Sequence, residues 1–186
     1  MRHSRGYGAA AVLGTAILAS TIFGDAGFGA TTPVSRAGGV VDVFAESNGS
    51  EPGRVVLTGA IGDSGSTTNV NASGKVDVKG DYIKLGLKAG TISANLTALY
   101  KLVGSATPAS SAATCSASFA ASSAVPLVDA TGAYKGVSGD VTLTFAVAVV
   151  LPRYASGKNK GQCNIDGDPT GEQVFVTGSG TVAFSS

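Results

Sequence analysis

The segment from Thr131 to Pro152 constrains the fold of this chain more than any other part of the sequence. It opens with a glycine-rich corner, Gly132–Gly139, and continues into the longest apolar alternation in the chain. One face carries Val141, Leu143, Phe145, Val147, Val149 and Leu151, and the other Thr142, Thr144, Ala146, Ala148 and Val150. A period of two over about eleven residues fits an extended strand and does not fit a helix. The second half is apolar on both faces, which indicates a central or covered strand, and Pro152, which has no N–H to donate, ends it.

Weaker alternating segments on both sides of this strand predict that the rest of the chain is also extended. Strands are expected at Val40–Ala45, Arg54–Gly62, Lys75–Lys79, Tyr82–Lys88, Thr91–Val103, Thr114–Ala121, Val125–Val128 and Gln173–Phe184. The arms Lys75–Lys79 and Tyr82–Lys88 are expected to pair as a hairpin. Glycine and polar clusters predict loops at Gly62–Gly65, Ser66–Gly74 and Arg153–Glu172. No helix is expected in this part of the chain.

The predicted architecture is an all-β, antiparallel β-barrel of eight or nine strands. Many inward positions are Ala, Val or Gly, and small inward residues suit a tightly curved barrel. Closure also removes the edges that so apolar a sheet could not safely expose. A β-sandwich is the alternative. A chain of 186 residues suits one domain, which is expected at 40–186 after a flexible lead-in at 31–39.

The N-terminus has the pattern of a secretory signal peptide, which is expected to span 1–30 as a signal helix. Arg2 and Arg5 supply the positive end, the run Gly6–Gly24 carries no charge, and small residues follow it. The protein is therefore expected to be secreted and extracellular. The alternative is an uncleaved segment that anchors the protein in a membrane.

Loss of the signal peptide would remove His3, the only histidine, together with Arg2, Arg5 and Asp25. Eleven basic and eleven acidic residues would then remain of the thirteen and twelve. A nearly neutral domain has no electrostatic footprint for nucleic acid or for an anionic membrane. Without histidine the domain cannot form a Ser-His-Asp or Cys-His nucleophile system or a His-ligated metal site. No cofactor is expected.

Two cysteines, Cys115 and Cys163, remain in the mature chain. In an exported protein such a pair predicts a single disulfide. Closing a loop of about 48 residues would stabilise the fold by roughly 4 kcal/mol on the chain-entropy model. The alternative is a pair of free thiols.

Three groups of residues are candidates for a site. Asp63 follows a strand and could act as a general acid or base at a barrel mouth, or simply form a turn. Arg153, Tyr154, Lys158 and Lys160 could contact an anionic wall polymer or a phosphate group, or be a solvated loop. Asn164, Asp166 and Asp168 alternate as the first ligands of a calcium loop do. However, Pro169 and Phe175 stand where such a loop has Gly and Glu, so a solvated turn is favoured over a metal site.

Two stretches resemble the dirigent and allene-oxide-cyclase-like β-barrel group: VLTGAIGDSG (Val56–Gly65) and TGAYKGVSGDVTLT (Thr131–Thr144). The resemblance implies a barrel whose glycine corner permits positive φ and whose Tyr134 plugs one end. It also implies Asp63 and Asp140 as inward acids near Tyr134, although no further residue matches either active site. The segment PRYASGKNKGQCN (Pro152–Asn164) resembles secreted actinobacterial proteins.

Three functions are consistent with these features. The favoured one is a secreted, non-enzymatic barrel that binds a small apolar ligand or a cell-surface partner through loops at one barrel end. The second is an isomerase or coupling protein like the barrels it resembles, which would use Asp63 or Asp140 in an apolar lumen. The third is a structural component of the cell wall or matrix. A lumen of about 300 Å³ or more would favour ligand binding.

Overall fold

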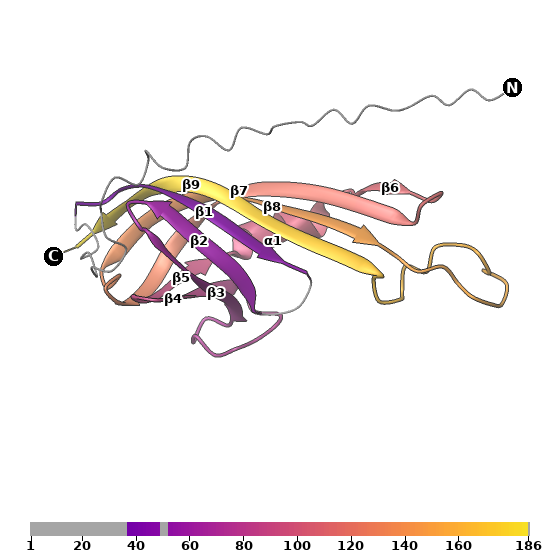
Figure 1. The fold of residues 1–186 in the computed structure, drawn as a ribbon, viewed down its shortest axis with the longest axis horizontal. Coiled ribbons are helices and arrows are strands. Elements are labelled where there is room, and N and C mark those ends of the chain that lie inside the picture. Colours follow the sequence, from indigo (N-terminus) through magenta and orange to yellow (C-terminus); the bar gives the residue numbers. More distant parts are fainter. Residues whose placement is uncertain (1–36, 49–51, 186) are drawn as a thin grey trace, which may run out of the picture. The chain divides into compact units, whose positions relative to one another are not determined.

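The fold was derived from a computed structural model, which describes residues 37–48 and 52–185. All described residues belong to one compact unit, Pro33–Ser186. They form nine strands and one helix (Figure 1). The elements are β1 (Gly39–Ser47), β2 (Gly53–Gly59), β3 (Asp63–Val70), β4 (Tyr82–Leu87), β5 (Gly90–Asn95), α1 (Thr97–Ser105), β6 (Ala109–Ser111), β7 (Ser116–Gly132), β8 (Val137–Val150) and β9 (Gly171–Phe184).

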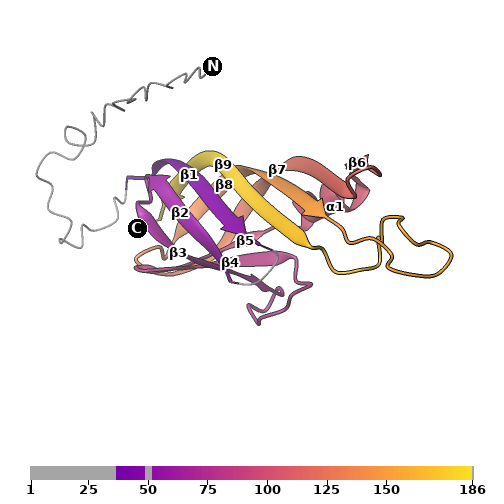
Figure 2. The same cartoon turned by 45° about the vertical axis from the view of Figure 1, so that its right-hand side comes forward.

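The strands form one antiparallel sheet that closes on itself. The neighbours run in the order β5-β4-β3-β2-β1-β9-β8-β7-β6, and an additional pairing between β5 and β7 closes an eight-stranded barrel. β6 lies outside this closed set and pairs only with the beginning of β7. Figure 2 shows how the strands wind around the barrel. The predicted antiparallel barrel is therefore confirmed, and the sandwich alternative is wrong.

Three strands continue beyond the closed part of the barrel as an arm. The arm consists of residues 116–118 of β7, 148–150 of β8 and 171–173 of β9, which lie beyond the last pairing of β9 with β1 at Val174 and remain in register at Ser116↔Val150 and Val150↔Gly171. On the right of Figure 1, these strands lead to the loop that follows β8. The long strand expected after the glycine corner is confirmed as β8.

One half of the barrel is filled by side chains. Inward residues from several strands pack at the end nearest the corner that joins β7 to β8: Val41, Leu57, Ile61, Ile92, Tyr134, Val137 and Val182. Tyr134 is only 1% exposed, so this end, called here the closed end, is plugged as expected. Gly132, Gly136 and Gly139 have φ of 63°, 82° and 131°, which confirms the need for glycine in the corner.

The predicted strand Thr91–Val103 is wrong in its second half, where β5 is followed by α1. Leu96, Leu99, Tyr100 and Val103 have helical spacing, and Leu99 is buried at 1% exposure. The side chain of Asn95 accepts hydrogen bonds from the N–H and the hydroxyl of Thr97 at 2.9 and 2.6 Å. This local bonding ends the strand and starts the helix, because Asn side chains compete with a sheet ladder.

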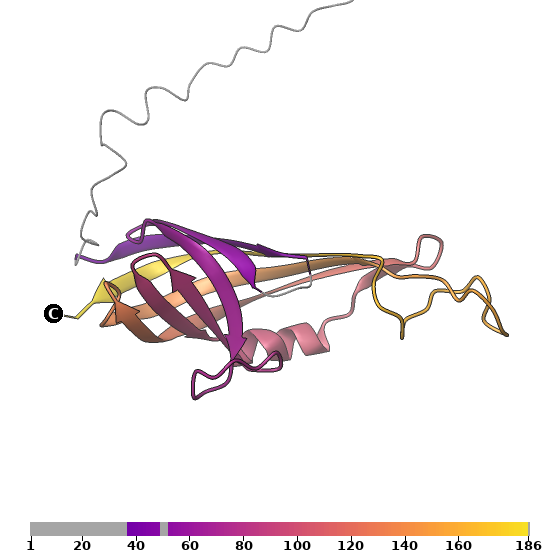
Figure 3. The same cartoon turned by 60° about the horizontal axis from the view of Figure 1, so that its bottom comes forward.

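The helix α1 also protects a strand edge. β7 pairs with β6 through residues 116–118 and with β5 through residues 127–132. Between these pairings α1 packs against β7, and Figure 3 shows it lying beneath the strands. Covering an unpaired edge in this way prevents it from pairing with another chain.

The predicted hairpin at Lys75–Lys79 is also wrong. This segment is a loop in which only Val76 forms an isolated bridge, to Val70, and Val76 and Val78 are 65% and 73% exposed. The partner of β4 is β3, which covers most of the region expected to be the loops Gly62–Gly65 and Ser66–Gly74. The polar sequence of β3 lacks apolar alternation. The segment is nevertheless a strand because it forms backbone hydrogen-bond ladders with β2 on one side and β4 on the other.

One further difference concerns strand boundaries. The weak strands expected at Thr114–Ala121 and Val125–Val128 are one continuous strand, β7, paired with β8 over most of its length. The signal helix and most of the predicted lead-in lie outside the described residues. In the part of the chain that the structure describes, no helix is long and apolar enough to cross a membrane.

Candidate ligand cavity

The half of the barrel away from the closed end contains a cavity of about 300 Å³. Its apolar lining comes from seven strands and the start of α1: Val43, Ala45, Val55, Ile83, Leu85, Ala94, Leu96, Leu99, Val125, Leu127, Val141, Leu143, Phe145, Val174 and Val176. These residues alternate along their strands with exposed ones, as expected where one face of a sheet is turned inward. The cavity therefore follows from the same alternation that specifies the barrel.

Small side chains explain why this half is hollow. Ala45 and Ala94 stand at inward positions where the closed end has larger residues. In β9, Gly178 faces inward between Val176 and Gly180, and a Cβ there would lie 2.4 Å from the Thr142 carbonyl oxygen and 2.7 Å from Leu143 Cδ2. Gly178 thus allows β9 and β8 to approach closely while the neighbouring valines line the cavity.

Polar side chains gather at the mouth of the cavity. Ser47, Thr67, Asn69 and Tyr100 line it beside the apolar residues. The Tyr100 hydroxyl donates a long hydrogen bond of 3.4 Å to Asn69 Oδ1, which connects α1 to β3. An apolar cavity with a few polar groups at its rim is the usual composition of a small-molecule site.

Glu172 is the charged side chain that faces this mouth. It is half-buried and lies on the same face of β9 as Val174 and Val176, both of which line the cavity. Glu46 also borders the cavity, but it is exposed and stands directly across from Arg54 on the outer face of the barrel. Among the lining residues within 37–48 and 52–185 there is no lysine or arginine.

Two larger hollows, of about 680 and 700 Å³, lie along the arm. They are bordered by short side chains such as Ala109, Ser118 and Ala148, all of which are exposed. A molecule there would keep most of its surface in water and gain little from apolar burial. The smaller cavity inside the barrel is the better candidate site because its walls are buried apolar residues.

Asp63 and Tyr134 are brought together at the closed end, away from the cavity. The Asp63 carboxylate accepts hydrogen bonds from the Tyr134 hydroxyl at 2.5 Å and from the N–H groups of Ser64 and Ala89 at 2.6 and 3.0 Å. Partial burial opposes ionisation of Asp63, but these hydrogen bonds hold its pKa below the usual value. Burial, and then the Asp63 carboxylate, raise the pKa of Tyr134.

The placement of the two acids limits a catalytic role. Asp63 does not line the cavity. The groups that donate hydrogen bonds to its carboxylate, from Tyr134, Ser64 and Ala89, all lie at the closed end. Asp140 is exposed on the outer face of β8, so its expected inward orientation is wrong. Strand alternation explains this, because Val141 next to it points into the core.

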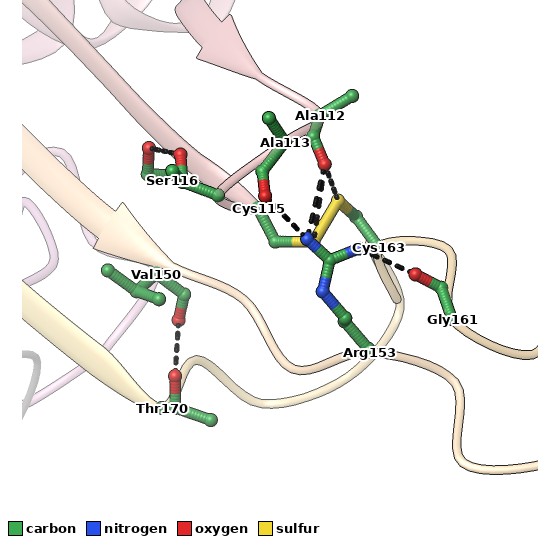
Figure 4. Close-up of a disulfide and its surroundings, with 10 residues drawn as sticks. Ala112, Ala113, Cys115, Ser116, Val150, Arg153, Gly161, Cys163 and Thr170 are labelled. Carbon is green, nitrogen blue, oxygen red and sulfur yellow. Dashed lines mark hydrogen bonds between the residues drawn. A yellow bond between two sulfur atoms is a disulfide. The ribbon is translucent and has the colours of Figure 1, made fainter.

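The disulfide between Cys115 and Cys163 is confirmed, with a Cα–Cα distance of 5.3 Å. Arg153 lies beside it (Figure 4) and donates to the carbonyls of Gly161 at 2.5 Å and Ala113 at 2.7 Å. Its guanidinium therefore fastens the loop after β8 to the turn before β7. Each terminal nitrogen of the guanidinium therefore has a backbone carbonyl as a partner, which supports a structural role for Arg153.

The other predicted loop residues are spread along this segment. The Tyr154 hydroxyl donates to Asp166 at 3.3 Å, and Lys158 and Lys160 are exposed. Asn164 Oδ1 accepts a hydrogen bond from the Asp166 N–H at 3.2 Å, which is the bonding of a turn. Asp168 is exposed. The structure does not bring these residues to the cavity.

The cavity residues Thr67, Asn69, Tyr100 and Glu172 were not identified from the sequence. Thr67 and Asn69 lie in β3, whose polar pattern resembles a loop, and Tyr100 lies in the unexpected helix. The predicted loop Arg153–Glu172 ends at Glu172, although the alternation of Glu172 with Val174 and Val176 is the pattern that would place it on β9. No family model, curated protein or solved structure matches this chain.

Proposed function

We propose that this protein is a secreted, non-enzymatic β-barrel that binds a small apolar ligand in the cavity of the barrel. The observation that supports this proposal is the cavity of about 300 Å³, lined by aliphatic side chains and opening at a polar rim. The disulfide is consistent with an oxidising, extracellular environment. The similarity of the glycine corner to barrels of the dirigent and allene-oxide-cyclase-like group fits the same class of hollow fold.

The size of the cavity limits the ligand. At roughly 30 Å³ for each water-sized group, the cavity holds about ten non-hydrogen atoms. Burying a chain of about eight CH₂ groups gives roughly 6 kcal/mol at 0.8 kcal/mol each, before the loss of translational freedom. Since part of this gain is offset, dissociation constants of about 0.1 to 1 mM are expected for a simple alkyl ligand.

The proposal is tested by titrating the isotope-labelled full chain with 1-octanol and following amide and methyl NMR signals. Shifts should concentrate on lining residues such as Leu85, Ala94 and Val125. The variant Ala45→Phe places a ring in the cavity and should weaken binding at least tenfold. Ala124→Phe adds the same ring at an exposed position of β7 and should bind as the wild type does.

Two outcomes would contradict the proposal. Shifts confined to exposed residues of the arm would mean that octanol binds the surface and not the cavity. Equal binding by Ala45→Phe and the wild type would mean the same, provided that both are folded by circular dichroism. Native mass spectrometry of protein from its own culture medium gives an independent test, because a co-purifying small molecule supports ligand binding, whereas a dimer favours the matrix hypothesis.

A further inference from the structure

The carboxylate of Glu172 points to the class of ligand that the cavity accepts. We propose that Glu172 selects apolar ligands with a cationic head group, such as a protonated alkyl amine, and discriminates against alkyl carboxylates. This inference rests on the proposed function, because it names the chemistry of the same cavity. The apolar walls of the cavity bind the tail of the ligand, and the carboxylate of Glu172 binds its cationic head group.

The position of Glu172 supports this role. It stands second in β9, directly across from Val149 of β8 and two positions before Val174, which lines the cavity. β1 pairs with β9 only as far as Val174, so Glu172 lies where the barrel wall ends and the cavity opens. A ligand whose tail reaches Val176 therefore brings its head group past Glu172.

The bonding of Glu172 also supports this role. It is half-buried, and among the described residues it makes no hydrogen bond or ion pair with another side chain. The neighbouring Gln173 differs, because its side-chain amide donates to the carbonyl of Ser47 at 3.0 Å. A carboxylate that is partly removed from water and has no partner gains more from a cationic ligand than a fully solvated one does.

The other charged residue at the border of the cavity is also acidic, which favours a cationic ligand as well. Glu46 is the second acid at the border, and the nearest base opposite it, Arg54, is exposed on the outer face. In the described part of the chain, no basic side chain lines the cavity. An alkyl carboxylate would therefore lose its hydration next to a like charge, which is unfavourable.

Three ligands with the same alkyl tail distinguish the effect of the head group from the affinity of the cavity for the tail. The full chain is titrated at pH 7 with 1-octylamine, 1-octanol and octanoate by NMR. We expect the amine to bind at least tenfold more tightly than octanoate, with octanol between them. In Glu172→Gln the amine and octanoate should differ by less than about threefold, and in Glu172→Lys the order should reverse, because only the charge at this position changes.

The control variant is Asp140→Asn, which removes an exposed carboxylate from the outer face of β8 and should keep the wild-type order. Equal binding of amine and octanoate to the wild type would overturn the inference while octanol binding still upheld the cavity. An amine preference that persists in Glu172→Gln would overturn it as well. If octanol itself does not bind, the proposed function fails, and the inference fails with it.

Discussion

The hydroxyl of Tyr134 donates a 2.5 Å hydrogen bond to Asp63, which lies 71 positions earlier in the sequence. The bond joins the corner before β8 to the first residue of β3 and so closes one end of the barrel. Asp63 also accepts from the backbone N–H of Ala89, in the turn between β4 and β5. One carboxylate therefore connects three separate turns, which is a structural role, as in the turn-forming alternative for Asp63, and differs from the acid or base role for which Asp63 was a candidate.

Tyr134→Phe removes the hydroxyl and keeps the ring that fills the closed end. We expect the free energy of unfolding to fall by about 1.5–3 kcal/mol, the range for a hydrogen bond to a charged group. Denaturation with urea at pH 7 measures this change. Tyr154→Phe is the matched control, because its hydroxyl makes a longer, solvent-exposed bond of 3.3 Å to Asp166, and its loss should be about 0.5 kcal/mol or less. Equal losses in the two variants would contradict this account.

The lowered pKa of Asp63 predicts how stability depends on pH. The folded state binds a proton at Asp63 less readily than the unfolded chain, whose Asp pKa is about 3.9. The stabilisation is therefore present above about pH 4 and is lost as the pH falls through the lower, folded pKa. Asp63→Asn should be less stable than the wild type at pH 7, and the difference should shrink at pH 2.

Urea titrations of the wild type and Asp63→Asn between pH 2 and pH 7 measure this convergence. Asp140→Asn serves as the control, because Asp140 is exposed on the outer face of β8. A difference between Asp63→Asn and the wild type that stays constant from pH 7 to pH 2 would rule out the carboxylate charge as its source.

A segment could be predicted from the sequence where its apolar residues repeat with one period only. β8 could be predicted because an apolar run with period two has one strand solution. Residues 92–102 also alternate, but Leu96, Leu99, Tyr100 and Val103 fit a helix equally well. The strand period of two and the helical period of about 3.6 both fit this segment. The hydrogen bond from the Thr97 N–H to the side chain of Asn95 ends the strand and favours the helix.

β3 could not be predicted from its own residues. Its sequence DSGSTTNV has few apolar positions, and its ladders with β2 and β4 are long-range contacts that a local pattern does not contain. For the same reason the cavity residues Thr67 and Asn69 were missed. The disulfide could be predicted from two cysteines in an exported chain, whereas the role of Arg153 depends on carbonyls of Ala113 and Gly161 brought together only by folding.

The disulfide should stabilise the protein without holding the barrel together. Cys115 precedes β7 and Cys163 lies in the loop after β8, both beyond the closed set of strands. We expect the double variant Cys115→Ser, Cys163→Ser to lose about 2–4 kcal/mol while its far-ultraviolet circular dichroism stays that of a β protein. Wild type reduced with dithiothreitol should match the double variant. Loss of the β spectrum in both samples at low denaturant would show that the barrel depends on the bond.

A close contact between β8 and β9 provides the last prediction. Gly178 lies opposite Leu143, and a Cβ on Gly178 would come within 2.4 Å of the Thr142 carbonyl oxygen and 2.7 Å of Leu143 Cδ2. Gly178→Ala should therefore force the two strands apart and lower the free energy of unfolding by about 1–3 kcal/mol. Gly171→Ala is a control on the same strand, because a Cβ there would meet nothing within 4 Å, and it should change stability by about 0.5 kcal/mol or less.

The double variant Gly178→Ala, Leu143→Ala tests whether the contact with the Leu143 side chain causes the loss of stability in Gly178→Ala. Leu143→Ala alone should be destabilising by about 2–5 kcal/mol, because it empties a buried position. In the double variant the contact with the Leu143 side chain is removed, so the combined loss should be smaller than the sum of the two single losses, while the contact with the Thr142 carbonyl oxygen remains. Additive losses in a double-mutant cycle measured by urea denaturation would mean that the Thr142 carbonyl oxygen, and not the Leu143 side chain, opposes a Cβ at Gly178.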